Sequence, residues 1–300
     1  MSRSLGAVLR EKMSMRRGML VPGAANALSA RVIEDLGFET VYLSGAGIAN
    51  MFLCVPDIGI LSLPELAQHT AATRDAVSLP LIVDADTGFG NAINVGHTVR
   101  TLERAGANAI QLEDQVMPKR CGHFNGKAVV SAEEMIGKVR AAVDARTTAD
   151  LLILARTDVL ALDGIEAAIE RAQQYVEAGA DMIFIEAPQN IDELRTIAMR
   201  IQVPQVANMV VGGKTPVVSA DELSKMGFGM VLYANAALQG ALLGMQKALS
   251  SLKAHGLLSE EDGTVVSFKE RQRLVQKGRF EDLEARYSSV ASTHKVRGTH

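Results

Sequence analysis

Acidic side chains and one arginine come at the carboxyl ends of several short apolar runs in this 300-residue sequence. They are Asp84, Asp86, Glu113, Asp114, Arg156, Asp158 and Glu186. Burial of an unpaired charge is costly, so these groups indicate a shared polar site. Carboxylates that converge on one rim repel one another, and a divalent cation relieves that repulsion. Hard oxygen ligands of this kind favour Mg²⁺, with Mn²⁺ as the alternative.

Three of these acids form the predicted carboxylate cluster. Asp84 and Asp86 are two residues apart. If both lie on one strand, their side chains point the same way. Glu113 ends the next apolar run and adds a third carboxylate. For any single acid, the alternative is that it caps the following helix or pairs with Arg156. As a set, the three predict metal binding.

The segment Lys119-Arg120-Cys121-Gly122-His123 places two cations before a thiol and a histidine after it. Both features lower the pKa of a cysteine and favour its thiolate. One Cys and one His do not make a zinc site, and a protease nucleophile lacks the groups it would need. We therefore predict that Cys121 is an acid or base on a mobile loop over the site. Cys54 has no cationic neighbours and is expected to be a packing residue.

A turn of small residues, Ser44-Gly45-Ala46-Gly47, follows the apolar run that contains Tyr42. Small residues let backbone N–H groups approach an anion closely, although a simple tight turn has the same composition. Arg156 offers a planar fork of donors that suits a carboxylate. These groups predict that an anionic ligand binds beside the carboxylate cluster.

The elements that position these groups are eight apolar runs, which alternate with longer amphipathic stretches. The runs are Met19–Pro22, Thr40–Leu43, Pro80–Asp86, Ala109–Asp114, Leu151–Asp158, Met182–Ala187, Gln205–Val210 and Met230–Asn235. Such alternation is typical of parallel strands buried on both faces. The residues before several runs are Gly37, Gly106, Gly179 and Gly227, which suit the ends of the preceding helices.

Eight strand–helix units predict an α/β fold of the (β/α)8 TIM-barrel type, whose active site lies at the carboxyl ends of the strands. An open doubly wound sheet is the alternative, but the turn at Pro22–Asn26 lacks its G-x-G-x-x-G pattern. Residues 236–253 and 264–286 are predicted to be additional helices that pack on a partner subunit or cap the barrel floor. We predict one domain, 1–300, with a C-terminal helical extension at about 236–287.

The composition excludes several other classes of protein. Lys plus Arg number 31 and Asp plus Glu 34, so the net charge of −3 gives no basic field for nucleic acid or a membrane surface. Aromatic residues are only 4% of the chain, which disfavours a stacking surface. Two cysteines cannot form a disulfide scaffold and are typical of a reducing compartment. With no apolar run of membrane-spanning length, we expect a cytoplasmic protein.

The order of these motifs resembles that of the isocitrate lyase and phosphoenolpyruvate mutase superfamily. The resemblance runs from about Val21 to Asn235 and is most specific at Lys119–His123, which is similar to the lyase signature of that superfamily. The other matching segments are Tyr42–Gly45, Val83–Gly90, Glu113–Gln115 and Ala155–Asp158. Within the superfamily, the chain is most similar to the short bacterial lyases of 2-methylisocitrate and dimethylmalate, with the petal death protein of plants nearby.

The resemblance implies a role for each matching residue. Asp84, Asp86 and Glu113 would hold Mg²⁺, in part through water, with Asp57 near the metal. Ser44, Gly45 and Ala46 would bind the carboxylate of an α-oxo acid, and Arg156 its oxygens. Glu186, Asn208, Cys121 and Gly122 would face the other half of the substrate. The resemblance also implies a homotetramer that exchanges its eighth helix between subunits.

The implied reaction cleaves the C2–C3 bond of a 2-hydroxy di- or tricarboxylate, by a retro-aldol or retro-Claisen step. The products would be pyruvate or another α-oxo acid and a saturated carboxylate. Cys121 would protonate the carbanion carbon, and Tyr42 or Glu186 would be the base. His123 and the two cations before Cys121 would stabilise the developing charge.

Two departures from the family pattern concern the substrate. Gln239 stands where 2-methylisocitrate lyases carry an arginine for a third carboxylate, which favours an alkylmalate. Arg271 is a candidate replacement and leaves 2-methylisocitrate open. Rival reactions are oxaloacetate hydrolysis or decarboxylation and the processing of phosphonopyruvate or phosphoenolpyruvate. Those branches typically lack the cysteine, but some relatives that carry it hydrolyse oxaloacetate, so this reaction stays open. A non-catalytic barrel scaffold is the alternative of another class.

Overall fold

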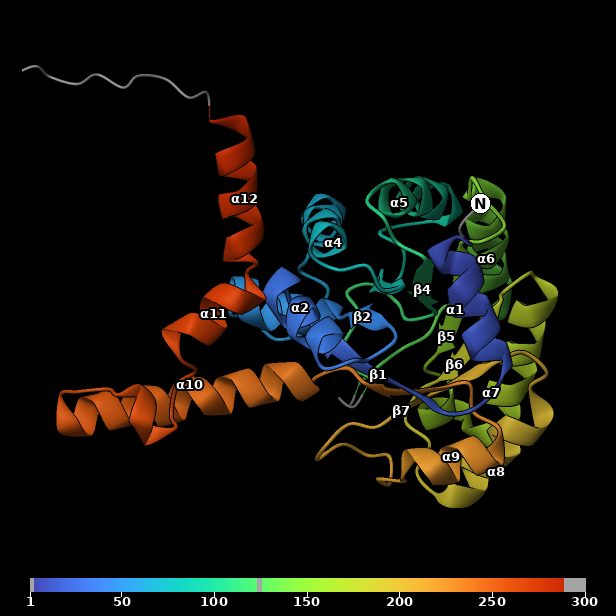
Figure 1. Ribbon diagram of the computed structural model, residues 1–300. Helices are drawn as coiled ribbons and strands as arrows, with labels where there is room; N and C mark the ends of the chain where they lie inside the picture. The colour runs from blue at the N-terminus through green and yellow to red at the C-terminus, as the bar shows by residue number, and fades with distance from the viewer. Residues whose placement is uncertain (1–2, 123–125, 289–300) are drawn as a thin grey trace, which may run out of the picture. The chain divides into compact units, whose positions relative to one another are not determined.

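Eight parallel strands form a closed barrel in the order β1 to β8 in the computed structural model, which describes residues 3–122 and 126–288 (Figure 1). The strands are β1 Met19–Ala24, β2 Val41–Leu43, β3 Leu81–Asp84, β4 Ala109–Glu113, β5 Leu152–Thr157, β6 Met182–Ile185, β7 Gln205–Asn208 and β8 Met230–Tyr233. The barrel closes where Met19–Pro22 of β1 pair with Met230–Tyr233 of β8. The predicted fold is therefore confirmed.

Helices follow the strands around the barrel. They are α2 Ala27–Asp35, the short α3 Gly45–Ile48, α4 Leu63–Ala76, α5 Ala92–Arg104, α6 Ala132–Ala145, α7 Leu160–Glu177, α8 Ile191–Arg200 and α9 Ala220–Met226. A π-helical turn, η1 Ala49–Leu53, continues α3. Gly37, Gly106, Gly179 and Gly227 all have positive φ angles after helices, between 82° and 107°. The structure thus confirms the predicted helix ends, because glycine adopts this backbone at little cost.

Two apolar layers hold the barrel together. The larger layer lies between strands and helices, and Val41, Val83, Ile153 and Ile183 belong to it. The inner layer contains alternate strand residues, among them Tyr42, Ile82, Leu154, Phe184 and Met230. Helix α1 (Leu5–Ser14) adds Leu9 and Met13 to the inner layer, both fully buried. The amino-terminal helix therefore packs against the barrel interior, which leaves the carboxyl ends of the strands for the site.

The chain forms two compact units, Met1–Leu243 and Gly244–His300. Helix α10 (Ala236–His255) begins in the first unit and continues in the second, which also holds the 3₁₀ turn η2 Glu260–Asp262, α11 Phe268–Leu274 and α12 Lys277–Tyr287. The single helix expected over 264–286 is wrong, because Gln276 adopts a left-handed φ of 57° between α11 and α12. The proposed single domain with an extension from about residue 236 stays a prediction.

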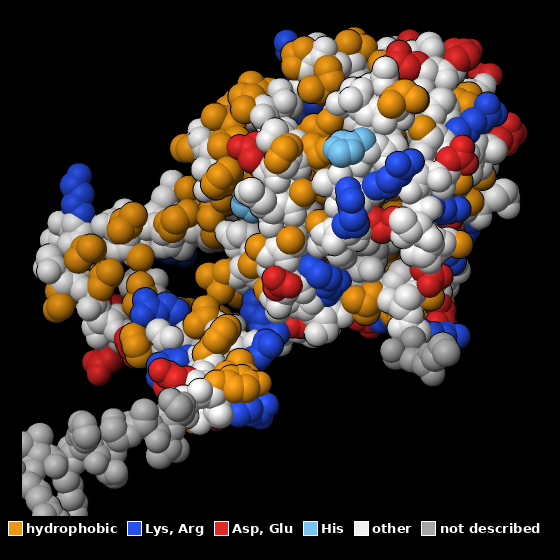
Figure 2. All heavy atoms as spheres, turned by 90° about the horizontal axis from the view of Figure 1, so that it is seen from above, with side chains coloured by type: hydrophobic (Ala, Val, Ile, Leu, Met, Phe, Trp, Pro, Cys, Tyr) orange, Lys and Arg blue, Asp and Glu red, His pale blue; other side chains and the backbone are white. Residues whose placement is uncertain are grey.

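Charged side chains of both signs are interspersed on the face shown in Figure 2. This mixture agrees with the nearly balanced composition of the chain. Among the described residues, no helix is both long and apolar enough to cross a membrane.

Candidate active site

A cavity at the carboxyl ends of the strands brings together most of the residues predicted for the site. It is lined by Tyr42, Ser44, Ala46, Asp57, Asp84, Cys121, Gly122, Arg156, Glu186 and Asn208, with Lys119, Phe184, Val210, Leu232, Ala234 and Asn235. From β3 onward, the strands end one or two residues before their apolar runs do. The polar groups therefore lie at the last strand residue or in the loop after it. Asp84, Arg156, Glu186 and Asn208 line the cavity, whereas Asp114 contacts Tyr175 and Arg171 of α7.

Two carboxylates converge on the glycine of the small-residue turn. A Cβ atom placed on Gly45 would lie 3.3 Å from Asp86 Oδ1 and 3.4 Å from Asp84 Oδ2. The backbone N–H of Gly45 donates to Asp84 Oδ2 at 3.4 Å. The reason predicted for this pair was wrong, because β3 ends at Asp84 and Asp86 lies in the following turn with a φ of 49°. The turn, rather than strand periodicity, brings Asp86 back beside Asp84.

Lys119 is the cation nearest to this cluster. Its side chain is 3% exposed, and its Nζ lies 2.7 Å from Asp86 Oδ1 and also pairs with Asp57. Burial alone would lower the pKa of Lys119, but Asp86, Glu113, Asp57 and Asp84 together raise it well above its usual value. Lys119 is therefore paired with two carboxylates and lies in the electrostatic field of two more.

Burial raises the pKa values of two carboxylates in this cluster, Asp86 and Glu113. Burial, opposed by Lys119 and reinforced by Asp84, raises the pKa of Asp86 to about 7. Burial also raises the pKa of Glu113 well above its usual range, against the attraction of Arg156. Both shifts have the sign expected where a buried acid cluster has too little positive charge.

The donor chemistry of this cluster fits a hard divalent cation held partly through water. Glu113 Oε1 is buried and has no hydrogen-bond partner among the described residues. In the same part of the chain, no three carboxylate, imidazole or thiol groups are already arranged to hold a metal directly. Mg²⁺ usually keeps several waters, so Asp84, Asp86 and Glu113 suit it without forming a closed cage.

A buried relay joins Tyr42 to the carboxylate cluster. The Tyr42 hydroxyl donates to Gln111 Oε1 at 2.9 Å, and Gln111 Nε2 donates to Asp84 Oδ1 at 3.0 Å. Burial and the nearby Asp84 carboxylate raise the pKa of Tyr42 well above its usual value. Tyr42 therefore stays protonated and acts as a hydrogen-bond donor.

Arg156 forms the second half of the site. Its Nε lies 2.9 Å from Asp158 Oδ2 and 3.4 Å from Glu113 Oε2, and its Nη1 lies 3.1 Å from Glu186 Oε2. The guanidinium carbon lies 5.0 Å from the centre of the Phe184 ring. These contacts fix the plane of the guanidinium group, which is the condition for directional binding of a carboxylate.

The predicted cysteine segment packs directly against Arg156. A Cβ atom on Gly122 would lie 2.5 Å from both Arg156 Nη2 and Glu186 Cγ, so only glycine fits there. The Cys121 backbone N–H donates to the Asp57 carbonyl at 3.2 Å. The backbone at Cys121 and Gly122 therefore contacts both Asp57 and Arg156, and Cys121 lines the cavity. His123, predicted to stabilise charge, lies outside the described residues.

Most backbone N–H groups of the small-residue turn already have hydrogen-bond partners within the protein. Ser44 caps the short helix α3, and its hydroxyl accepts from the Gly47 N–H at 3.1 Å. The Gly45 N–H has a partner in Asp84, and the Ser44 N–H donates to the Ala24 carbonyl at 3.0 Å. Three of the N–H groups expected to bind an anion are therefore already used. Ser44 and Ala46 do line the cavity.

Sequence reasoning missed or misread several positions. Gln111 and Lys127 are buried polar groups that were missed, because no local pattern separates them from surface residues. Lys119, predicted to stabilise developing charge, is buried against Asp86 and Asp57. Cys54 is exposed, so its prediction as a packing residue is wrong; it ends η1 with a left-handed φ of 56°. Neither described cysteine forms a disulfide.

Comparisons with known proteins identify the family to which the chain belongs. A family model described as phosphoenolpyruvate phosphomutase matches residues 9–253, so the chain belongs to that family. It is 42% identical over 283 residues to the 2,3-dimethylmalate lyase of Eubacterium barkeri, which covers 94% of this chain and 98% of the relative. It is 48% identical over 251 residues to the 2-methylisocitrate lyase of Aeropyrum pernix, covering 84% and 80%.

Solved structures are similar over nearly the whole chain. A crystal structure of 2,3-dimethylmalate lyase, a member of the phosphoenolpyruvate mutase and isocitrate lyase superfamily, matches with a TM-score of 0.89 and 32% identity, covering 97% of this chain and 98% of that one. A phosphonopyruvate hydrolase complex with oxalate and Mg²⁺ matches with a TM-score of 0.85 and 33% identity, covering 96% and 100%. These findings confirm the predicted superfamily and the enzyme class, a lyase.

Proposed function

We propose that this protein is a divalent-metal-dependent carbon–carbon lyase that cleaves a 2-hydroxy dicarboxylate of the alkylmalate type. The observation that carries the proposal is the cavity itself. Cys121 lines this cavity together with Arg156 and Glu186, and Asp84, Asp57 and Lys119 line it as well. Lyases of dimethylmalate and 2-methylisocitrate among the relatives support this reaction class.

The metal in this proposal is Mg²⁺, held by Asp84, Asp86 and Glu113. When bound, it would supply a Lewis acid for the carboxylate and hydroxyl oxygens of the substrate. The buried carboxylates around Lys119 support this role, because Glu113 Oε1 has no hydrogen-bond partner among the described residues and can accept a further cation. The Mg²⁺ in the related phosphonopyruvate hydrolase structure supports the identity of the ion.

The residues of the chain divide the proton transfers between them. The proton of the 2-hydroxyl group goes to the base, and the electron pair left on that oxygen forms the C2=O bond of the α-oxo acid. The C2–C3 bond breaks, and its electron pair moves into the carboxylate beside C3. The Cys121 thiol then donates its proton to C3, which releases the saturated acid. Between the two predicted bases we favour Glu186, because Tyr42 would have to ionise beside Asp84.

The wall of the cavity favours an alkyl substituent over a third carboxylate. Val210, Leu232 and Ala234 line the cavity together with polar groups. Gln239, where 2-methylisocitrate lyases carry an arginine, is neutral and donates its backbone N–H to the Asn235 carbonyl. A site without that arginine fork loses the bidentate contact that a third carboxylate needs.

An assay of α-oxo acid release tests the proposal. The panel contains 2,3-dimethylmalate, other alkylmalates, 2-methylisocitrate, isocitrate and oxaloacetate, each with Mg²⁺. We expect pyruvate from an alkylmalate and little from 2-methylisocitrate. Gln239→Arg should shift the preference toward 2-methylisocitrate. Faster cleavage of 2-methylisocitrate by the unaltered protein would contradict the substrate, and oxalate from oxaloacetate alone would favour the hydrolase alternative.

We also propose that the protein is a homotetramer. An apolar groove is lined by α2 and the start of α10, including Leu28, Val32, Leu36 and Leu238. Leu36 is 70% exposed, which is unusual for a leucine in such a groove. A second copy of the chain is the proposed occupant. Light scattering should give four times the chain mass of 32.0 kDa, and Leu36→Lys should lower it; a monomer in the unaltered protein would contradict the proposal.

A further inference from the structure

Lys127 is a buried cation that the reaction proposed above does not use. Its side chain is only 2% exposed. Burial of a lysine is costly unless it is paired and hydrogen-bonded. The contacts of Lys127 therefore indicate what its burial achieves.

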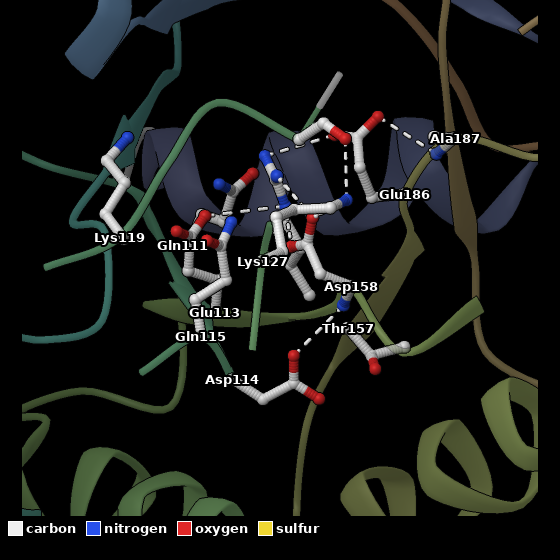
Figure 3. Close-up of polar contacts among 12 residues, drawn as sticks. Gln111, Glu113, Asp114, Gln115, Lys119, Lys127, Thr157, Asp158, Glu186 and Ala187 are labelled. Carbon is white, nitrogen blue, oxygen red and sulfur yellow. Dashed lines mark hydrogen bonds and ion pairs between the residues drawn. The ribbon is translucent and has the colours of Figure 1, made fainter. Parts of the chain in front are cut away.

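The Lys127 ammonium group joins two parts of the site. Its Nζ donates to the Gly122 carbonyl at 2.6 Å and to Asp158 Oδ1 at 2.7 Å (Figure 3). Gly122 is the residue after Cys121 in the chain. Asp158 in turn accepts from Arg156, through Nε at 2.9 Å and Nη2 at 3.1 Å. One carboxylate thus holds both the arginine and the lysine.

The backbone of Asp158 is fixed by contacts with the barrel and with α7. The Asp158 backbone N–H donates to Asp114 Oδ1 at 3.0 Å. Asp114 Oδ2 accepts from the Tyr175 hydroxyl at 2.8 Å and pairs with Arg171 at 3.2 Å. Asp158 is therefore held at the carboxyl end of β5 and cannot follow a displaced loop.

We propose that Lys127 is a positioning residue that sets the Cys121 thiol against the substrate held by Arg156. The inference rests on the proposed lyase function. Lys127 touches neither substrate nor metal; it acts by tying the carbonyl beside the thiol to the carboxylate behind the arginine. Without Lys127, Arg156 keeps its two bonds to Asp158, while the Gly122 carbonyl loses its ammonium donor.

The test is Lys127→Met, which removes the ammonium group and retains a long apolar side chain. Because a displacement of about 1 Å can cost about 100-fold in rate, we expect kcat to fall about 10- to 100-fold. The Kd for oxalate with Mg²⁺ should change by less than about threefold, since Arg156 stays in place. Lys127→Arg, which keeps a donor, should recover part of kcat.

A second readout does not depend on turnover. The rate of Cys121 alkylation by iodoacetamide should rise about 10-fold in Lys127→Met, because the segment is no longer held. The exposed Cys54 would also react, so the series is made in a Cys54→Asn background; asparagine tolerates the left-handed backbone there. Lys138→Met is the matched control, since Lys138 is also buried and donates to the Thr87 carbonyl.

The outcomes separate the possibilities. In Lys138→Met the alkylation rate of Cys121 should stay unchanged, even if both methionine variants lower Tm. An unchanged kcat and alkylation rate in folded Lys127→Met would overturn the inference, as would a parallel loss of oxalate binding. If Lys127→Met does not fold, an alkylation rate in Lys127→Arg equal to that of the unaltered protein overturns it. Absence of turnover in the unaltered protein refutes the lyase proposal, while the alkylation rates still decide the role of Lys127.

Discussion

Removal of the Asp158 charge should destabilise the protein strongly at neutral pH. The carboxylate is fully buried and accepts from Lys127 and Arg156. Burial alone would raise its pKa, but these cations lower it from 3.8 to about 2. A shift of this size corresponds to about 2 kcal/mol of stability. Asp158→Asn also leaves the buried Lys127 without its charge partner, while Arg156 keeps Glu113 and Glu186; the unpaired lysine brings the expected loss toward about 3–5 kcal/mol.

The stabilisation that Asp158 provides should decrease as the pH falls. Because the folded-state pKa of Asp158 is depressed, its contribution is complete above the ordinary value of 3.8 and disappears as the pH falls toward about 2. The difference in free energy of unfolding between the unaltered protein and Asp158→Asn should therefore be constant from about pH 5 to 7. It should narrow at lower pH, where the native carboxylate itself becomes protonated.

Urea unfolding followed by circular dichroism at several pH values measures this gap. Asp192→Asn is the control, because Asp192 pairs with Arg195 on the surface with its side chain 89% exposed. An exposed pair of this kind contributes about 0–1 kcal/mol. A gap for Asp158→Asn that matches the Asp192→Asn control at pH 7, or that stays constant down to pH 2.5, would refute the reasoning.

Three further substitutions test other parts of the site. Gly122→Ala should reduce kcat/KM at least about 100-fold, because its Cβ would lie 2.5 Å from Arg156 Nη2; a value within threefold would contradict the packing. Asp86→Ala should raise the Mg²⁺ concentration needed for half-maximal activity at least about 10-fold, and an unaffected titration would remove Asp86 from the metal site. Tyr42→Phe should retain measurable turnover, since Tyr42 is a donor to Gln111; complete loss would favour Tyr42 as the base.

The fold could be predicted because its signals are local. Each strand is a short apolar run, and glycines such as Gly106 and Gly179 mark the helix ends through their left-handed backbone. The boundaries were less predictable, because the polar residues at the mouth continue each run without belonging to the strand. Asp86 shows this best: it was placed on β3, yet it lies in the turn beyond it.

The acids, Arg156 and Cys121 could be predicted as a set because charges after apolar runs are conspicuous. The residues that donate hydrogen bonds to these groups, Gln111 and Lys127, could not be predicted. Gln111 reads as an ordinary strand residue, and Lys127 as a surface lysine in a loop. Their roles depend on partners 27 and 31 positions away, Asp84 and Asp158. Only the closure of the barrel brings such partners together.

The most direct test of the central claim compares the unaltered protein with Cys121→Ala in the α-oxo acid release assay. With Mg²⁺ and 2,3-dimethylmalate, the unaltered protein should release pyruvate, and removal of the metal by a chelator should abolish it. Cys121→Ala should lose at least about 100-fold in kcat, because general acid catalysis contributes about 10²–10⁴-fold, while oxalate binding is retained. Equal pyruvate release by both proteins would contradict the account.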